Sequence, residues 1–256
     1  MKKYDVIIVG AGIAGMTAAI YAVRGGKEVL VLESRVEGGQ IINTTSIENW
    51  PGELGISGVG LTRKIKEQAE ELGAEFDYAE VKKIEKNANG WTMIGEDDEK
   101  FEASVVILAM GTEPRKLSKK QAADAGERAI SYCATCDGAL YKNRPVVVVG
   151  SGNTAKHETA YLKNIASKVY HIHHDDPIPK DAVAVFVAIG RVPSTNFCDG
   201  LVELDENGYI IAGEDCRTSE EGIFVSGDCR TKNLRQLVTA AADGAIAGTE
   251  AIKYLG

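Results

Sequence analysis

Two cysteines separated by two residues, Cys133-Ala-Thr-Cys136, are followed directly by Asp137. A pair at this spacing can close into a disulfide and open again. Its reactive form is the thiolate, and this motif lowers a thiol pKa from about 8.5 towards 7 or below. One glycine-rich nucleotide signature begins at Gly10 and a second at Gly150, soon after the cysteines. A dithiol between two dinucleotide motifs predicts electron transfer from a cofactor to a disulfide.

A zinc site is the main alternative use of such a pair, and it needs two further ligands at matching spacing. The remaining cysteines, Cys198, Cys216 and Cys229, contain no second close pair. We therefore predict no metal site and interpret these three as small apolar residues that fill the core. The chain has no evident secretory signal, which disfavours a purely structural disulfide.

Length and composition favour an α/β protein of one large or two modest domains. The chain has 256 residues, of which 28 are glycine and 44% are hydrophobic. Its net charge of -8 disfavours nucleic acid as a partner. No apolar run approaches the roughly 20 residues that a membrane-spanning helix needs. We expect a cytoplasmic protein in a reducing setting, with neither a membrane nor a nucleic acid as its partner.

A complete dinucleotide fingerprint lies at the N-terminus. The strand Val6–Val9 leads into the glycine turn at residues 10–15, which opens a helix over residues 16–23, and a second strand over residues 28–32 ends at Glu33. In this pattern Gly10 permits the tight turn, Gly12 lets a pyrophosphate approach the helix, and Gly15 lets helix and strand pack closely. Glu33 can bind the hydroxyls of a ribose. The pattern predicts a site for an adenine dinucleotide.

The second fingerprint departs from this pattern. A strand over residues 145–149, the turn Gly150-Ser-Gly152-Asn-Thr-Ala155 and a helix to about residue 166 lead to a strand over residues 168–172. His173-His174-Asp175-Asp176 follows, where NADPH requires cations for its 2′-phosphate. The two carboxylates would repel that phosphate, and an acid here could instead favour the unphosphorylated ribose of NADH.

The second module is also short. Only the eight residues Asp175–Ala182 precede the next strand, residues 183–189. A parallel crossover needs a dozen or more residues and usually contains a helix. We therefore expect three strands and one helix, without a floor for a nicotinamide.

Further motifs stand in a characteristic order: Gly38-Gly39-Gln40, Ile47-Glu-Asn-Trp-Pro-Gly52, the dithiol, Gly227-Asp228, and Arg235-Gln236 at the start of a helix to about Tyr254. In this order the chain resembles the low-molecular-weight thioredoxin reductases over nearly its whole length. That family places a His-Arg-Arg run where His173-His174-Asp175 stands here. In its truncation the chain resembles the ferredoxin-dependent flavin thioredoxin reductases, which lack a working pyridine nucleotide site.

The resemblance implies that the first site binds FAD. The implied contacts are Gly10, Gly12, Ile13, Ala14, Gly15, Glu33, Ser34, Gly39, Gln40, Asn43, Thr44, Asn49, Val81, Gly111, Gly227, Asp228, Arg235, Gln236 and Leu237. Among these, Gly111 would lie near the adenine side and Arg235-Gln236 would face the isoalloxazine.

The resemblance also implies roles for the dithiol. Cys136 would lie against the flavin and accept its electrons, and Cys133 would attack the disulfide of thioredoxin. Cys136 would then resolve the mixed disulfide. Asp137 would protonate a leaving thiolate, although a helix N-cap or first-turn acid is an alternative role for it.

The implied architecture is an α/β flavoprotein fold with two dinucleotide-binding domains, the second of them a truncated, NADPH-like domain. Residues 1–115 and 196–256 would form the FAD domain, and residues 116–195 would form the inserted dithiol domain. Residues 113–115 and 191–194 would be the two linkers. The resemblance further implies a homodimer.

The expected function is reduction of thioredoxin by FAD and the dithiol, with reduced ferredoxin as the donor. Ferredoxins are usually acidic, so a local basic patch is needed, with Lys116, Lys119, Lys120, Arg230 and Lys232 as candidates. The alternatives are a reductase that uses NADPH or NADH at a minimal site and a non-catalytic redox sensor that binds FAD. The cysteine pair counts against a flavoprotein NADP reductase of the same fold.

Overall fold

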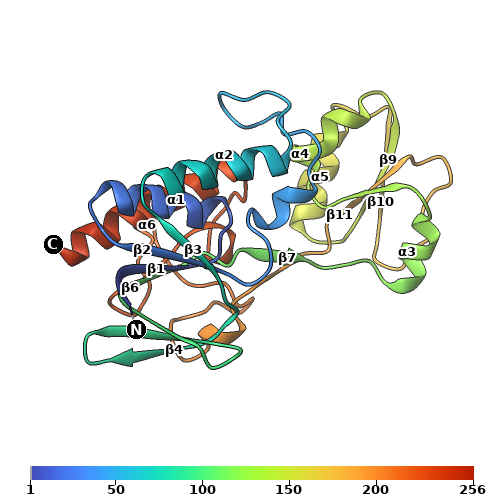
Figure 1. Ribbon diagram of the computed structural model, residues 1–256. Helices are drawn as coiled ribbons and strands as arrows, with labels where there is room; N and C mark the ends of the chain where they lie inside the picture. Colours follow the sequence, from blue (N-terminus) through green and yellow to red (C-terminus); the bar gives the residue numbers. More distant parts are fainter. Residues whose placement is uncertain (1) are drawn as a thin grey trace. The chain divides into compact units, whose positions relative to one another are not determined.

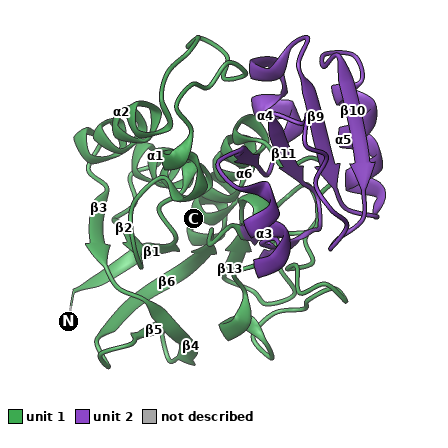
Figure 2. Ribbon diagram, turned by 90° about the vertical axis from the view of Figure 1, so that its right-hand side faces the viewer, with its two compact units in different colours: residues 1–112, 193–256 green, residues 113–192 purple. Residues whose placement is uncertain are grey.

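The computed structural model describes residues 2–256, which divide into two compact units (Figures 1 and 2). Within the described residues, unit 1 comprises residues 2–112 and Pro193–Gly256, and unit 2 comprises Glu113–Val192. Unit 2 is therefore an insertion in unit 1. The two connecting segments, β7 (Thr112–Pro114) and β12 (Arg191–Pro193), pair with each other in a two-stranded sheet.

Unit 1 is built on a seven-stranded sheet in the order β3-β2-β1-β6-β5-β4, with β13 also paired to β6. Its strands β1, β2, β3, β6 and β13 are parallel, whereas β4 and β5 form an antiparallel hairpin. The strands are β1 (Lys3–Val9), β2 (Val29–Glu33), β3 (Glu75–Tyr78), β4 (Val81–Asn87), β5 (Gly90–Gly95), β6 (Lys100–Leu108) and β13 (Ile223–Val225).

The central strand β1 is buried on both faces, as its β-branched run predicts. Val6 and Ile8 belong to one core cluster, and Ile7 and Val9 to another on the opposite face. The helices of unit 1 are α1 (Ile13–Arg24), α2 (Gly58–Glu71) and α6 (Leu237–Leu255), and its short 3-10 turns are η1 (Gly39–Asn43), η3 (Asn196–Cys198) and η4 (Gly227–Cys229). Helices α1 and α6 approach so closely that a Cβ atom at Gly244 would lie 2.2 Å from the carbonyl oxygen of Ala14.

Unit 2 contains a four-stranded parallel sheet in the order β10-β9-β11-β8. Its elements are α3 (Lys119–Ala125), β8 (Ala129–Ser131), α4 (Ala134–Asp137), η2 (Gly138–Tyr141), β9 (Pro145–Val149), α5 (Asn153–Leu162), β10 (Lys168–Ile172) and β11 (Ala184–Val187). Residues of α4 and α5 pack on one face of the sheet, and residues of α3 and of the β10–β11 connection pack on the other.

The sequence prediction of three strands and one helix for this module is wrong, because β8 adds a fourth strand and α3 and α4 are further helices. The connection from β10 to β11 crosses β9 without a helix, over residues 173–183. Gln121 of α3, which is 1% exposed, holds this connection. Its side-chain amide donates to the carbonyl oxygens of His173 and Asp176 and accepts from the amide of Asp175. Ile178 and Ala182 then complete the core that a crossover helix would otherwise cover.

Within residues 2–256, no helix is long and apolar enough to cross a membrane.

Candidate active site

Many of the predicted cofactor residues gather at one edge of the unit 1 sheet. Strands β1, β2, β6 and β13 run parallel, so their carboxyl ends meet at this edge, which is where α/β sheets bind nucleotides. Glu33 is the last residue of β2, and the residues that follow the strand ends are Gly10, Gly12, Gly15, Ser34, Gly111, Gly227 and Asp228. Ile13 and Ala14 are buried in the first turn of α1.

The first glycine turn has the shape that a pyrophosphate requires. Gly10 has φ +107°, and a Cβ atom there would lie 2.5 Å from the carbonyl oxygen of Ala109. A Cβ atom at Gly15 would lie 1.9 Å from the carbonyl oxygen of Gly10. Gly12, by contrast, has no neighbour within 4 Å of a Cβ atom, and no side chain caps the start of α1. The space beside Gly12 is therefore open next to the uncapped backbone amides of α1, and such a place is favourable for an anion.

Glu33 points back to the glycine turn. Its carboxylate accepts hydrogen bonds from the amides of Ala11 (2.8 Å) and Arg35 (3.0 Å), and the Ser34 hydroxyl lies 3.4 Å from it. Val81 begins β4 and is buried, and nearby Ala79 donates its amide to the carbonyl oxygen of Glu33. These contacts place the acid beside the turn, as a ribose-binding residue requires.

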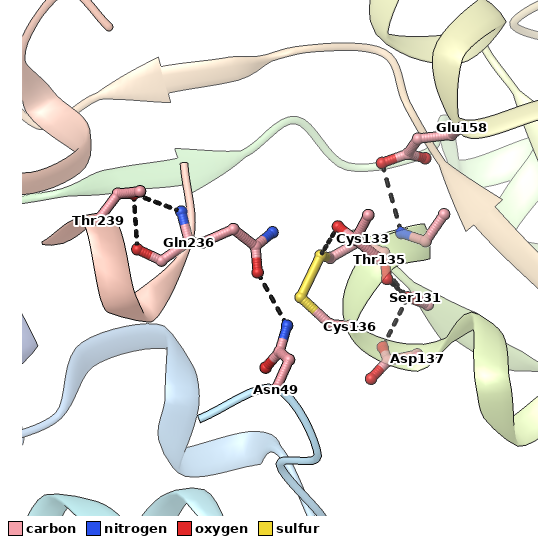
Figure 3. The surroundings of a disulfide bond; sticks show 10 residues. Asn49, Ser131, Cys133, Thr135, Cys136, Asp137, Glu158, Gln236 and Thr239 are labelled. Atoms are coloured by element: carbon pink, nitrogen blue, oxygen red, sulfur yellow. Dashed lines mark hydrogen bonds between the residues drawn. A yellow bond between two sulfur atoms is a disulfide. The ribbon is translucent and has the colours of Figure 1, made fainter. Parts of the chain in front are cut away.

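The segment after β2 lies against the same turn. The amide of Gly38 donates to the carbonyl oxygen of Ala11. Gly39, Gln40 and Asn43 form η1, in which Gln40 donates to the backbone of Thr112, and the carbonyl oxygen of Thr44 accepts from the amide of Gly58. Farther along, Asn49 donates its side-chain amide to the Gln236 side chain (3.0 Å; Figure 3).

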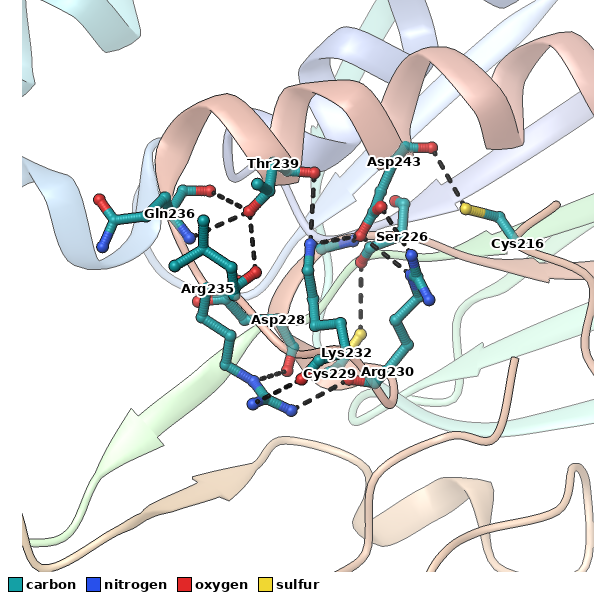
Figure 4. Close-up of polar contacts among 12 residues, drawn as sticks. Cys216, Ser226, Asp228, Cys229, Arg230, Lys232, Arg235, Gln236, Thr239 and Asp243 are labelled. Atoms are coloured by element: carbon teal, nitrogen blue, oxygen red, sulfur yellow. Dashed lines mark hydrogen bonds and ion pairs between the residues drawn. The ribbon is translucent and has the colours of Figure 1, made fainter. Parts of the chain in front are cut away.

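A buried charge cluster supports the turn at Gly227 (Figure 4). Asp243 of α6 accepts from the amide of Gly227 (3.1 Å), from two guanidinium nitrogens of Arg230 (2.9 and 3.0 Å) and from Lys232 (2.6 Å). Burial raises the pKa of Asp243, but the hydrogen bonds from Arg230 and Lys232 outweigh it and hold the pKa below its ordinary value. The cluster fixes the backbone on which Asp228 stands.

This cluster corrects one expectation from the sequence. Arg230 and Lys232 were candidates for an exposed basic patch, but their side chains are only 5% and 6% exposed. Both are paired with Asp243, so neither can steer a partner. A lone acid within the apolar run of residues 237–248 was the signal that a buried cation must lie nearby.

Residues 235–237 link this turn to the start of α6. The Arg235 guanidinium donates to the carbonyl oxygens of Asp228 (3.2 Å) and Arg230 (3.1 Å) and lies 4.2 Å from the centre of the Tyr209 ring. The Arg235 side chain is therefore directed onto the backbone of residues 228–230. Gln236 caps α6 in a capping box with Thr239, and Leu237 is the first residue of the helix.

The residues of unit 1 fit FAD. Three features lie together at one edge of the sheet. They are the open space at Gly12 that a side chain would fill, the uncapped amides at the start of α1, and the Glu33 carboxylate in the position of a ribose-binding acid.

In unit 2, Cys133 and Cys136 form a disulfide with their Cα atoms 5.3 Å apart (Figure 3). Cys133 precedes α4, and its carbonyl oxygen accepts from the amides of Cys136 and Asp137. Cys133 is partly buried and Cys136 is exposed. The short turn therefore holds both sulfur atoms within bonding distance.

Ser131 connects Asp137 to this turn. The Ser131 hydroxyl donates to the Asp137 carboxylate (2.6 Å) and accepts from the amide of Cys133 (3.2 Å). Asp137 is a first-turn acid of α4, so the structural role considered for it applies. The same contacts hold its carboxylate close to the backbone of Cys133.

Glu158 is a residue of this site that the sequence reasoning missed. It lies on α5, and its carboxylate accepts from the amide of Ala134 (3.4 Å), the residue after Cys133. Burial raises its pKa to about 7, opposed by that hydrogen bond and by the charge of Arg191. Its spacing from the buried Ala155 and Leu162, three and four residues away, was a signal that it faces inward.

The second glycine turn repeats the backbone shape of the first. The amide of Gly150 donates to the carbonyl oxygen of Ile172, as Gly10 does to Leu32, and a Cβ atom at Gly152 has no neighbour within 4 Å. The difference lies after the second strand. His173 occupies the position that matches Glu33, and its Nδ1 lies 2.7 Å from the hydroxyl of Ser151.

The three remaining cysteines are buried, as predicted. Burial raises the pKa of the Cys198 and Cys216 thiols to about 12 and that of the Cys229 thiol to about 11. They are therefore protonated at neutral pH and lack the reactivity of the dithiol.

Comparison with known proteins identifies the family. The model of the pyridine nucleotide-disulphide oxidoreductases matches residues 4–182 and 175–244. The thioredoxin reductase of Listeria innocua is 36% identical and aligns with 99% of this chain and 94% of its own length. The chain belongs to the thioredoxin reductase family. As a member of this family it is an FAD-binding flavoprotein and a disulfide reductase with an adjacent cysteine pair.

Solved structures agree with this assignment. Thioredoxin reductase from Streptococcus pyogenes is 34% identical, with a TM-score of 0.90 over 99% of this chain and 98% of that one. A ferredoxin-flavin thioredoxin reductase from Clostridium acetobutylicum is 27% identical, with a TM-score of 0.64 over 100% of this chain and 98% of that one.

The alignments also locate what this member lacks. The alignment with the Listeria innocua protein extends over 302 residues, more than the 256 residues of this chain. The family match divides at residues 175–182, within the β10–β11 connection. Residues that the relative possesses are therefore missing here, and the division of the match points to this connection.

Proposed function

We propose that the protein reduces thioredoxin through Cys133 and Cys136 with electrons that come from reduced ferredoxin instead of NADPH. The hydrogen-bonded pair of Ser151 and His173 carries the proposal. Ser151 and His173 occupy the positions at the second glycine turn that Ala11 and Glu33 occupy at the first. There the amide of Ala11 donates to the carboxylate of Glu33. His173, and not an acid for a ribose, stands at the position that matches Glu33, and no cluster of arginines for a 2′-phosphate follows β10.

The shortened connection supports the same proposal. The acids after β10 are engaged in holding the connection: Asp175 accepts from the Ser118 hydroxyl, and Asp176 accepts from the amide of His173. Rearranging them to accept a nucleotide would break the contacts that replace a crossover helix. We infer that unit 2 is a reduced remnant of an NADPH-binding domain.

Charge distribution removes the objection that an acidic ferredoxin would be repelled. Unit 2 contains 12 Lys and Arg against 8 Asp and Glu, a net charge of +4. Unit 1 contains 17 against 29, a net charge of -12. Lys116, Lys119 and Lys120 of unit 2 are exposed, so this unit offers an acidic partner a favourable surface.

Within the proposal, each residue of the dithiol has one task. When bound, FAD accepts electrons singly or in pairs and so links a one-electron donor to a two-electron disulfide. Two electrons open the Cys133–Cys136 bond. The Cys133 thiolate then attacks the thioredoxin disulfide and displaces one of its sulfurs, which takes a proton from Asp137. Cys136 attacks Cys133, releases the second thioredoxin thiolate and restores the disulfide.

An anaerobic titration of the flavin-loaded protein tests the donor. We expect reduced ferredoxin to bleach the flavin absorbance within the mixing time, and NADPH and NADH to leave it unchanged at micromolar concentration. Rapid bleaching by either nucleotide would establish the alternative, a minimal nucleotide site.

A second measurement separates an enzyme from a redox sensor. The protein reduced by ferredoxin is expected to reduce thioredoxin over many turnovers. Reduction of the flavin without turnover would favour the sensor. The family resemblance also leads us to propose a homodimer, which light scattering after size-exclusion chromatography would test.

A further inference from the structure

We propose that Glu158 is a positioning residue of the dithiol, whose carboxyl group holds the turn at Ala134 and whose charge controls the ionisation of Cys133. Glu158 lies on α5 and accepts a hydrogen bond from the amide of Ala134, which Figure 3 draws as the dashed line that ends on the Glu158 carboxylate. The inference rests on the dithiol function proposed above, but its test requires neither an electron donor nor thioredoxin.

Geometry supplies the first argument. The Glu158 carboxylate reaches the amide next to Cys133, and Ala134 itself is fully buried. One oxygen of the carboxyl group accepts this hydrogen bond, while the other, Oε2, is buried without a hydrogen-bond partner. A buried carboxylate oxygen without a donor favours the protonated form, because burial penalises the charge.

The surroundings supply the second argument. Asp137 and the two cysteines lie on or before α4, Arg191 on β12 provides a positive charge, and His157 on α5 is exposed. The pKa of about 7 lies in the range where the dithiol works. Glu158 therefore changes its charge under the conditions in which a cysteine thiolate must form.

The consequence is a coupled titration. A negative charge on Glu158 disfavours a thiolate on Cys133, and a thiolate favours the protonated carboxyl group in turn. In the reduced protein, formation of the Cys133 thiolate and protonation of Glu158 are thus linked. The substitution Glu158→Gln keeps an acceptor for the Ala134 amide and removes the charge.

The experiment measures alkylation of the dithiol by iodoacetamide from pH 5 to pH 9, after reduction with dithiothreitol and its removal. We expect Glu158→Gln to lower the apparent pKa of the reactive thiol and to raise the alkylation rate at pH 7 about three- to tenfold. The matched control is Glu127→Gln, which removes one charge from an exposed position of unit 2. It is expected to leave the profile unchanged.

An unchanged thiol pKa in a folded Glu158→Gln protein would overturn the inference, as would an equal shift in the Glu127→Gln control. If the glutamine variant does not fold, infrared difference spectra of the wild-type protein decide the question. We expect reduction at pH 7 to convert one carboxylate into a protonated carboxyl group. The absence of that change would also refute the proposal, whereas failure of the ferredoxin or thioredoxin assays would not affect it.

Discussion

The two glycine turns of this protein share a backbone but differ in what surrounds them. Gly12 and Gly152 begin their helices with φ -75° and -81°, and neither has a neighbour within 4 Å of a Cβ atom. At the first turn, Glu33 accepts a hydrogen bond from Ala11, and α6 packs against the start of α1. At the second, His173 takes the position of the acid and the connection that follows lacks a helix. A glycine fingerprint thus predicts the backbone turn, whereas our proposal that only the first turn binds a nucleotide rests on the residues after the second strand.

Two acids, the buried Asp243 of unit 1 and the partly buried Glu158 of unit 2, have opposite pKa shifts. Asp243 of unit 1 is paired with two cations, and its pKa lies below the ordinary value. Glu158 of unit 2 has one amide donor, and burial raises its pKa to about 7. The first acid is kept charged to support a backbone turn, and the second is poised to titrate.

The largest effect is expected from Asp243→Ala. Removing this carboxylate leaves Arg230 and Lys232 buried without their partner, which should lower the free energy of unfolding by about 3–5 kcal/mol. Urea denaturation measures the loss. The control is Gln121→Ala in unit 2, which removes a neutral amide and should cost only about 1–3 kcal/mol. Equal losses of unfolding free energy in the two variants would mean that the ion pairs of Asp243 stabilise unit 1 no more than the neutral amide of Gln121 stabilises unit 2.

The matched substitutions Gly12→Val and Gly152→Val test the turns directly. A Cβ atom at either position has no protein neighbour within 4 Å, and neither backbone has a positive φ, so we expect any difference between the two variants to reflect a ligand. Gly12→Val should weaken FAD binding by about 100-fold, because it fills the space for the pyrophosphate. Gly152→Val should leave FAD binding and thioredoxin reduction unchanged. Fluorescence titration with FAD is the measurement, and a loss of thioredoxin reduction in Gly152→Val would restore the second turn as a nucleotide site.

The opposite pKa shifts of the two acids predict opposite pH dependence. Because the folded pKa of Glu158 is raised, its contribution favours the folded state below its ordinary pKa of 4.5 and is lost as the pH rises through about 7. Glu158→Gln should therefore gain about 2 kcal/mol relative to wild type between pH 5 and pH 8, less than the full shift because water partly screens the group.

Asp243 works in the other direction. Its pKa is lowered, so its contribution is present above its ordinary pKa and disappears as the pH falls through the folded value. Urea denaturation at pH 5 and pH 8 measures the difference for Glu158. If the advantage of Glu158→Gln were as large at pH 5 as at pH 8, the carboxyl group would not titrate in this range.

The smallest effect concerns the donor. Reversing Lys116, Lys119 and Lys120 to glutamate should slow flavin reduction by ferredoxin about tenfold at low salt, and the difference should fade as salt is added. The control reverses three exposed lysines of unit 1, Lys82, Lys83 and Lys86, and should have little effect. Stopped-flow absorbance follows both. Similar slowing by the two triple variants would mean that net charge alone, and not unit 2, attracts the donor.

The sequence allows the nucleotide turn and the dithiol to be predicted because their signals are local. A strand, three glycines and an acid stand at fixed spacing around Gly10, and a disulfide needs only the spacing of Cys133 and Cys136. The short strand β8 has no such pattern, since Ala129-Ile-Ser131 contains one apolar β-branched residue. It forms because β11 offers it an edge.

Burial of charge is harder to predict than a turn. Arg230 and Lys232 look like surface cations until the fold brings Asp243 to them from a later helix. Likewise, Glu158 is one acid in a polar helix until α4 packs over it. These are tertiary contacts, and spacing along the chain does not contain them.

The insertion of unit 2 also determines the order in which the protein can be assembled. Strand β13 joins the unit 1 sheet beside β6, although more than one hundred residues separate them in the chain. During synthesis, unit 2 is a continuous segment that emerges complete, whereas β6 must wait with an open edge for β13. Closing so long a loop is slow compared with local folding. The cofactor-binding edge is therefore complete only after β13 and α6 have been synthesised, and the dithiol unit can fold before the flavin has a place to bind.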